Sequence, residues 1–162
     1  MEKSKKLILF MPSIEGGGVE KNLIILANYF AKRMRHIYLI TFDNAFSSNF
    51  NKKIKIISFK KKSKKESKYF KYFACLYLLV KEYFINKNIL VFAFQANIYC
   101  LILSKILCFD VVVRSNSAPT GWSNDFFKNL IFKFFFRFAK TIIVNSFEFK
   151  KQLDKKFGKK SK

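Results

Sequence analysis

The sequence predicts an α/β protein with a doubly wound, mostly parallel six-stranded sheet and helices on both faces, the Rossmann-like architecture. Short apolar runs alternate with longer segments of helical periodicity along the whole chain. The short runs are apolar at successive positions, as expected for strands that are buried on both faces. The chain has 162 residues, of which 51% are hydrophobic, so one domain with a sizeable core can form.

The chain opens with a predicted strand and a predicted helix. The strand is the apolar run 7–11, LILFM, and Pro12 ends it. Apolar residues then recur at helical spacing from Val19 onward. Lys32 and Arg33 are expected in the last turn of this helix, where positive charge suits the helix dipole.

Three consecutive glycines, Gly16, Gly17 and Gly18, lie between this strand and this helix. They allow a tight turn and a close approach of the backbone to a ligand. A helix that begins directly after such a turn points free N–H groups at the space in front of it, which favours an anion and most often a phosphate. The run is neither GxGxxG nor a Walker A motif, so an ordinary strand-to-helix turn is the alternative.

The rest of the chain continues the alternation of strands and helices. The other five strands are expected over residues 37–42, 54–59, 89–94, 111–114 and 141–144. The other four helices are expected over residues 69–84, 96–107, 126–139 and 148–157. Ser146 is a predicted cap for the last helix and Gly158 ends it, while residues 43–51 and the lysine-rich residues 60–65 are expected to be loops.

The uncharged segment 88–104 is nearly long enough to span a membrane. Gln95 and Asn97 lie in its middle, and the neighbouring segments repeat the rhythm of strand, turn and helix. We therefore interpret it as a strand followed by a helix.

The chain is strongly basic, with 32 Lys and Arg residues against 10 Asp and Glu residues and a net charge of +22. Such a charge favours a nucleic acid, an anionic membrane or a phosphorylated substrate as partner, although a lysine-rich coding bias also explains it. The absence of RNP, KH and helix-turn-helix patterns argues against nucleic acid. The helix 126–139 has an aromatic side and a basic side, as in membrane-surface helices, and a core-facing helix with a basic solvent side is the alternative.

The cysteines and the histidine show no ligand pattern. Cys75, Cys100 and Cys108 form no CxxC pair and have apolar neighbours, so we interpret them as reduced core residues of a cytosolic protein. His36, the one histidine, is expected at the opposite edge of the sheet from the glycine turn and completes no metal site. We expect no metal, no cofactor and no secretory signal.

Turn-forming and polar residues follow the first, fourth and fifth predicted strands. With the strand order 3-2-1-4-5-6, these strand ends meet at one edge near the switch point, where ligands of doubly wound sheets bind. Pro119 and Gly121 follow the fifth strand, as Pro12 and the glycines follow the first. The candidate cleft residues are Glu20, Gln95, Asn97, Arg114, Asn116 and Trp122.

Two of these candidates have open alternatives. Arg114 can clamp a phosphate or a carboxylate with two parallel hydrogen bonds, or it can pair with Asp110 or Asp125. Trp122 can stack on a sugar or a base, or it can anchor its loop. No Ser/His/Asp trio and no paired carboxylates are visible, so no catalytic residue is assigned.

Four stretches of the chain resemble a known family. They are MPSIEGGGVEKNLIILANYFAKR, ITFD, VVVRSNSAP and TIIVNSFEFKKQLDKKFG. Together they resemble the amino-terminal domain of a family 4 glycosyltransferase of the GT-B fold, and the resemblance covers nearly the whole chain. The strand, the P-S-x-x-G-G-G-x-E motif and the helix are its most specific part.

The resemblance implies transfer of a sugar from a nucleotide-sugar to an acceptor with retention of configuration, as a hexosyltransferase. Members of the family often build lipopolysaccharide or capsule on lipid-linked acceptors at the cytoplasmic face of the membrane. By this resemblance Gly17 and Gly18 approach the donor diphosphate, and Glu20 falls on the acid of the motif. Arg114 and Asn116 line the acceptor side, and the basic, aromatic surface contacts an anionic membrane peripherally.

The sequence departs from the family pattern in two ways. Met34 and Arg35 stand where the family usually has Gly-His. The family also has a second Rossmann-like domain that carries most of the nucleotide-sugar site, whereas this sequence stops at Lys162. We therefore expect one amino-terminal domain over residues 1–158, a basic tail over 159–162 and no second domain.

These observations favour the acceptor-side half of a glycosyltransferase that is inactive alone. The chain would then be one half of a split enzyme whose carboxy-terminal half is encoded separately, a fragment of a longer enzyme, or a degenerate remnant of one. The alternative is a non-catalytic basic module that binds anionic membrane or nucleic acid. A third possibility is a small α/β enzyme with its own nucleotide site, although no acidic residue after a GxGxxG supports a dinucleotide.

Overall fold

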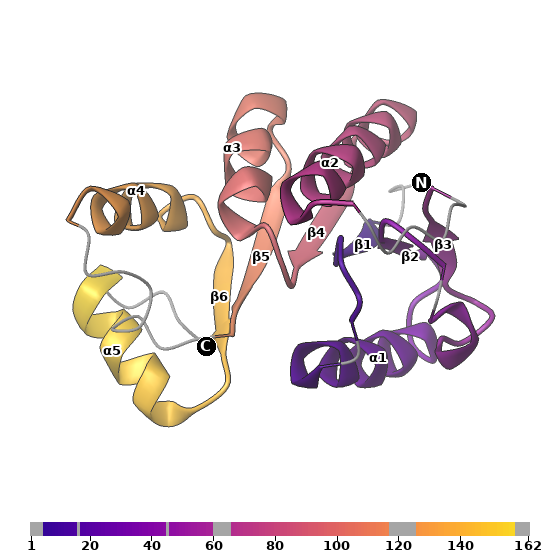
Figure 1. The fold of residues 1–162 in the computed structure, drawn as a ribbon, viewed down its shortest axis with the longest axis horizontal. Coiled ribbons are helices and arrows are strands. Elements are labelled where there is room, and N and C mark those ends of the chain that lie inside the picture. Colours follow the sequence, from indigo (N-terminus) through magenta and orange to yellow (C-terminus); the bar gives the residue numbers. More distant parts are fainter. Residues whose placement is uncertain (1–4, 16, 45, 60–65, 117–125, 158–162) are drawn as a thin grey trace.

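The computed structural model describes residues 5–15, 17–44, 46–59, 66–116 and 126–157, and it has a central sheet with helices on both sides (Figure 1). The strands lie in the order β3-β2-β1-β4-β5-β6, and every pairing between them is parallel. The predicted doubly wound fold and strand order are therefore confirmed. The strands are β1 (Lys6–Phe10), β2 (Ile37–Ile40), β3 (Lys55–Ile57), β4 (Ile89–Ala93), β5 (Asp110–Ser115) and β6 (Thr141–Val144).

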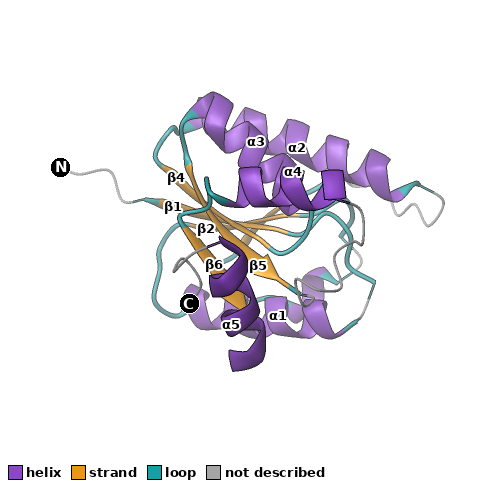
Figure 2. Cartoon of the chain, turned by 90° about the vertical axis from the view of Figure 1, so that its left-hand side faces the viewer, coloured by secondary structure: helices purple, strands orange, loops and turns teal. Residues whose placement is uncertain are grey.

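Each predicted helix is present, with small differences at the ends. The helices are α1 (Gly18–Ala31), α2 (Lys68–Ile85), α3 (Asn97–Leu107), α4 (Phe126–Phe136) and α5 (Phe147–Phe157). Figure 2 shows α2, α3 and α4 on one face of the sheet and α1 on the other. A short 3₁₀ helix, η1 (Ser47–Asn49), lies in the expected loop 43–51.

The helix ends differ from the prediction for a local reason. Lys32 and Arg33 lie just after α1, because their N–H groups bond to carbonyls three residues earlier in a tight final turn. The same tightening at Phe138 and Ala139 ends α4 earlier than predicted. The N-cap prediction for α5 is confirmed, since the Phe149 N–H donates to Ser146 Oγ at 3.2 Å.

Alternate residues of each central strand enter different cores. Ile8 and Phe10 of β1 join the core that includes Leu79 of α2. Leu7 and Leu9 face the opposite core, which includes helix α1. This two-sided burial explains why the strand sequences are apolar at every position. It also confirms that segment 88–104 is a strand followed by a helix, and no described helix is long and apolar enough to cross a membrane.

The cysteine prediction is correct for two of the three thiols. Cys75 and Cys100 are buried and free, and burial raises the pKa of Cys75 to about 12. Cys108 is exposed, contrary to the expectation of a core residue. It ends α3 with a left-handed backbone, φ 58°, at a position that turns the chain out of the helix.

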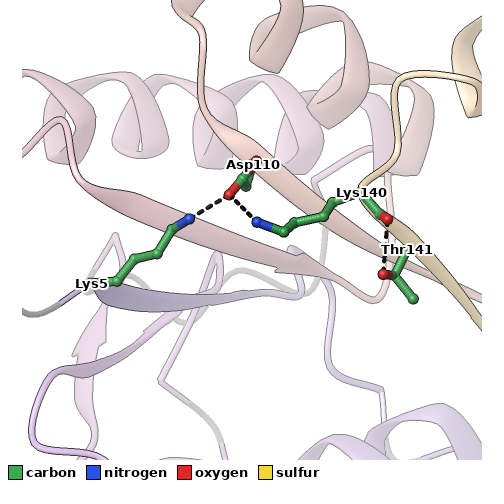
Figure 3. A network of polar contacts seen from close by, with 4 residues as sticks. All are labelled: Lys5, Asp110, Lys140 and Thr141. Carbon is green, nitrogen blue, oxygen red and sulfur yellow. Dashed lines mark hydrogen bonds and ion pairs between the residues drawn. The ribbon is translucent and has the colours of Figure 1, made fainter.

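An ion-pair network ties three strands together at the amino edge of the sheet. The Asp110 carboxylate at the start of β5 accepts from Lys5, which precedes β1, and from Lys140, which precedes β6, at 2.7 Å (Figure 3). Lys140 also accepts a hydrogen bond at its carbonyl from the Thr141 hydroxyl at 2.9 Å. This carboxylate therefore lies at the opposite edge from the strand ends that carry the candidate site residues.

The substitution Asp110→Asn tests this network. Hydrogen bonds from Lys140 and Lys5 hold the pKa of the Asp110 carboxyl below its ordinary value of 3.8. A carboxylate with a lowered folded-state pKa contributes stability above its unfolded-state pKa, and that stability is lost as the pH falls through the folded-state pKa. Because the side chain is 36% exposed, we expect a loss of less than about 1 kcal/mol in the free energy of unfolding at pH 7.

Urea denaturation across a pH series measures this loss. The difference between Asp110→Asn and the unmodified protein should shrink as the pH is lowered from about 5 toward 2. The double variant Asp110→Asn with Lys140→Met should lose less free energy of unfolding than the two single variants lose together. Each substitution removes the same Asp110–Lys140 contact, so the two effects are not additive. A difference of constant size across the series would contradict the assigned role.

Candidate functional site

The candidate site lies at the carboxyl edge of the sheet, next to the switch point between β1 and β4. These strands are neighbours, but the chain leaves β1 toward α1 on one face and leaves β4 toward α3 on the other. The backbone N–H of Ser13, after β1, donates to Gln95 Oε1, after β4, at 3.0 Å. Gln95 therefore lies where the sequence predicted it and holds the two strand ends together.

Two asparagines at this edge each use one half of the side-chain amide. Asn97 Nδ2 donates to the carbonyl oxygen of Arg114 at 2.9 Å, and Asn116 Nδ2 donates to the carbonyl oxygen of Phe94 at 2.8 Å. The Oδ1 atom of each asparagine is buried and has no hydrogen-bond partner among the described residues. Two hydrogen-bond acceptors are therefore available at the ends of β4 and β5.

Arg114 brings a positive charge and a free donor to the same edge. It is only 6% exposed, and its Nε and Nη2 atoms donate to Asn145 Oδ1 at 3.3 and 2.8 Å. Nη1 is buried without a partner in the described part of the chain. The guanidinium also lies 5.6 Å from the ring centre of Phe94, and burial lowers the pKa of Arg114 from its ordinary value of 12.5.

The described neighbour of Arg114 rules out one of its two predicted ion pairs. Its described hydrogen-bond partner is the neutral amide of Asn145, whereas the Asp110 carboxylate is bound to lysines at the amino edge. The predicted alternative of an ion pair with Asp110 is therefore wrong. Asp125, the other candidate partner, lies outside the described residues.

The glycine turn is filled by an acidic side chain. Gly17 is the N-cap of α1, and Glu20 in the first turn is 8% exposed. The Glu15 N–H lies 3.5 Å from Glu20 Oε1, and a Cβ atom on Gly17 would lie 2.9 Å from Glu20 Oε2. The Glu20 carboxylate thus folds back toward the helix N-terminus, where the sequence predicted a phosphate. Gly18 has open space around it, and the phosphate-binding role of the turn stays a prediction.

Four polar residues at this edge, Ser13, Glu15, Lys71 and Asn145, were not among the predicted site residues. Lys71 of α2 is 9% exposed and its Nζ donates to Ser13 Oγ at 3.4 Å, and Ser13 Oγ donates to Glu15 Oε1 at 2.7 Å. Nothing local separates Lys71 from the other lysines of its helix. Asn145 had a usable signal, because it directly follows β6 as Gln95 follows β4.

The structure brings together Gln95, Asn97, Arg114 and Asn116, while Glu20 lies at the start of α1. Gly16, Pro119, Gly121 and Trp122 lie outside the described residues, as does Gly158. His36 precedes β2 at the amino edge, as predicted. Within the described ranges no three His, Cys, Asp or Glu side chains lie close enough to hold a metal ion.

Alanine at the two described glycines separates helix stability from the Glu20 contact. Gly18→Ala should keep or raise stability, because space is open there and alanine is favoured over glycine in a helix by up to about 1 kcal/mol. Gly17→Ala should be less stable than Gly18→Ala, because its Cβ atom displaces the Glu20 carboxylate. Chemical denaturation measures both.

The control is the same pair of variants with Glu20→Ala. In the Glu20→Ala background, Gly17→Ala should no longer be less stable than Gly18→Ala. The carboxylate that the new Cβ atom would displace is absent there. Persistence of the full loss in the Glu20→Ala background would show that the backbone of the turn, and not the carboxylate, requires glycine.

Comparisons with known proteins identify solved structures with a similar fold, but no relative with a similar sequence. No protein-family model matches the sequence, and no curated protein matches it significantly. HepE from Anabaena, in a crystal structure with UDP and glucose, is 20% identical with a TM-score of 0.69 over 98% of this chain and 43% of its own. The lipopolysaccharide outer core galactosyltransferase WaaB is 12% identical, with a TM-score of 0.61 over 98% of this chain and 44% of its own.

A plant structure gives the same result. UGT73P12 from Glycyrrhiza uralensis, crystallised with glycyrrhetinic acid 3-O-monoglucuronide, is 12% identical with a TM-score of 0.59, over 98% of this chain and 48% of its own. The chain thus spans less than half the length of each of these proteins. At such low identity the likeness concerns the fold, and the chain has the fold of one Rossmann-like half of a GT-B glycosyltransferase.

Proposed function

We propose that this chain is the acceptor-side, amino-terminal half of a retaining family 4 glycosyltransferase, inactive without its carboxy-terminal half. It would move a sugar from a nucleotide-sugar to a surface-glycan acceptor that is lipid-linked. One observation carries the proposal. Three polar side chains with unpaired, buried atoms, Asn97, Arg114 and Asn116, meet at the carboxyl edge of a sheet that matches half of GT-B structures.

The unpaired atoms suit a hydroxyl-rich ligand. A buried polar atom without a partner costs about 1–3 kcal/mol, and a ligand that pairs with it recovers that cost. Asn97 Oδ1 and Asn116 Oδ1 need donors, whereas Arg114 Nη1 needs an acceptor. A sugar hydroxyl both donates and accepts, so a glycan satisfies this mixed set. Gln95, Glu20 and Trp122 complete the proposed cleft, with Gln95 acting through its hold on Ser13.

The proposed donor is a nucleotide-sugar with a uridine diphosphate group. This part of the proposal comes from the similar structures, since HepE was crystallised with UDP-glucose. The amides of Gly16, Gly17 and Gly18 would approach the diphosphate at the start of α1. The other wall of the cleft would come from a second domain, since this chain spans less than half of the similar proteins.

A transfer assay with UDP-glucose and UDP-galactose tests this proposal. The chain alone should give no turnover, and addition of the carboxy-terminal half of a GT-B protein as a separate chain should produce it. In the active mixture Arg114→Met should lower kcat/KM by about 10- to 100-fold, because it removes a charged hydrogen-bond donor.

The matched control is Arg33→Met, which removes an exposed arginine at the other end of α1. It should leave kcat/KM unchanged, and thermal unfolding should show both variants folded. Robust turnover by the isolated chain would refute its role as half an enzyme. Equal rates for Arg114→Met and Arg33→Met would refute the role of the carboxyl edge.

The exposed face of α2 and α4 favours a second candidate function, peripheral binding to an anionic membrane. Phe127, Ile131 and Phe134 of α4 are 73%, 47% and 54% exposed, so this apolar side of the helix is turned to solvent and not to the core. Helix α2, on the same face of the sheet in Figure 2, exposes Tyr69, Phe73, Tyr77 and Phe84. Lysines interrupt both sets, and exposed aromatic and basic residues together are typical of membrane-surface helices.

Vesicle sedimentation tests the membrane contact. The chain should bind vesicles rich in phosphatidylglycerol, and each lysine near the surface should contribute about 1 kcal/mol at low salt. Binding should weaken in high salt and in Phe134→Ser. The matched control is Ile25→Ser on α1, which is 66% exposed on the opposite face of the sheet and should bind normally. Equal weakening by the two substitutions, or stronger binding to RNA than to vesicles, would contradict this function.

A further inference from the structure

A pocket of about 460 Å³ lies at the amino edge of the sheet, beside the end of α1. Two segments of the chain form it, the end of α1 with the connection to β2, and Lys53, which lies just before β3. Because β2 and β3 are parallel neighbours, with Tyr38 paired to Lys55, the residues that precede these strands meet at one edge. The lining consists of Ala31, Lys32, Arg33, Met34, Arg35 and Lys53.

Hydrogen bonds hold the second segment against α1. Asn28 of α1 donates from Nδ2 to the Asn49 carbonyl at 3.0 Å, and its Oδ1 accepts from the Asn51 N–H at 2.7 Å. The Asn51 side chain in turn accepts from the Lys53 N–H at 3.0 Å. Ile54, the next residue, is buried in the core that includes α1. Contacts within the protein therefore fix the place of Lys53 at the pocket.

Three positive side chains of the lining lack a partner. Among the residues that the structure describes, the side chains of Lys32, Arg35 and Lys53 are exposed and make no hydrogen bond or ion pair. The guanidinium of Arg33 differs, because it lies 3.8 Å from the ring centre of Tyr29. The pocket therefore gathers charge that the described part of the chain leaves unpaired.

The negative groups near this edge do not offset the charge. The lining carries no acidic residue, and the carboxylates of Glu82 and Asp110 are bound to other lysines, namely Lys5, Lys6 and Lys140. The end of α1 supplies only about half a negative charge. Like charges around one hollow repel each other, and an anion between them replaces that repulsion by attraction. A single phosphate carries at most about two negative charges, so a chain of linked phosphates matches three cations better.

We propose that this pocket binds a chain of linked phosphates, free or as the triphosphate of a nucleotide, and that Lys32, Arg35 and Lys53 hold it. Arg35 can hold a phosphate with two parallel hydrogen bonds, whereas the two lysines act as point charges. The lining has no aromatic ring on which a base could stack, so recognition rests on the phosphates. The inference is independent of the proposed function, because the pocket and the proposed cleft lie at opposite edges of the sheet.

Titration calorimetry of the full chain with inorganic tripolyphosphate at low salt tests the site. Tripolyphosphate should bind about tenfold more tightly than orthophosphate, or more, because it reaches all three cations at once. ATP and UTP should bind alike and no more tightly than tripolyphosphate, because the base makes no contact. The amide NMR signals of residues 31–35 and 53 should shift on addition of tripolyphosphate.

Removal of two lysines separates the pocket from the general charge of the chain. Lys32→Met with Lys53→Met should weaken tripolyphosphate binding by about tenfold. The matched control is Lys81→Met with Lys105→Met, which removes the same charge from exposed positions on α2 and α3, on the opposite face from α1 (Figure 2). The control should bind tripolyphosphate as the unmodified protein does. Without ligand the pocket variant should be at least as stable to heat as the control, because it relieves repulsion.

Asn28→Ala tests the geometry of the pocket at constant charge. It frees the segment that carries Lys53, so tripolyphosphate binding should weaken severalfold below the unfolding temperature. In the Lys53→Met background the same substitution should have no further effect, because the charge that Asn28 positions is gone. A weakening of equal size in both backgrounds would contradict the positioning role.

Two outcomes would overturn the site itself. Equal weakening of tripolyphosphate binding by the two double-lysine variants would leave only a general attraction between the basic chain and an anion. Loss of single-stranded RNA binding in Lys32→Met with Lys53→Met, with unchanged tripolyphosphate binding, would assign this edge to nucleic acid instead.

Discussion

The parallel direction of all six strands is the constraint on which the rest of the structure depends. Parallel strands need crossover helices, and those helices bury both faces of the sheet, so the strands are apolar throughout. The same geometry brings every strand's carboxyl end to one edge. Polar groups of different strands, such as Ser13 with Gln95 and Arg114 with Asn145, therefore become neighbours although long stretches of sequence separate them.

The fold was largely predictable from the sequence, because the signals that define it are local. Apolar runs, helical periodicity and a cap such as Ser146 act over a few residues, and the rule for doubly wound sheets supplies the strand order. Helix ends were less predictable, since the final turns of α1 and α4 tighten into i to i+3 bonds that no residue type demands. The exposure of Cys108 depends on a left-handed backbone that its sequence does not signal.

For the candidate site residues, their place at the carboxyl edge of the sheet was predictable from the sequence, and their hydrogen-bond partners were less so. Gln95, Asn97, Arg114 and Asn116 follow strands, and the strand order brings them together. The hydrogen-bond partner of Arg114 depends on which nearby polar group comes within reach, and this partner is the neutral amide of Asn145, which neither predicted role of Arg114 had named. Lys71 shows the same limit, because its burial comes from the packing of α2 over the sheet and not from its sequence neighbours.

The Glu20 carboxylate has a consequence for selectivity. Since the end of α1 already faces an internal anion, a free phosphate ion that enters gains little: it exchanges one negative charge for another and loses its own hydration. Only a ligand with further contacts elsewhere offsets that exchange. The carboxylate thus lowers the affinity expected of this helix terminus for a small anion such as inorganic phosphate.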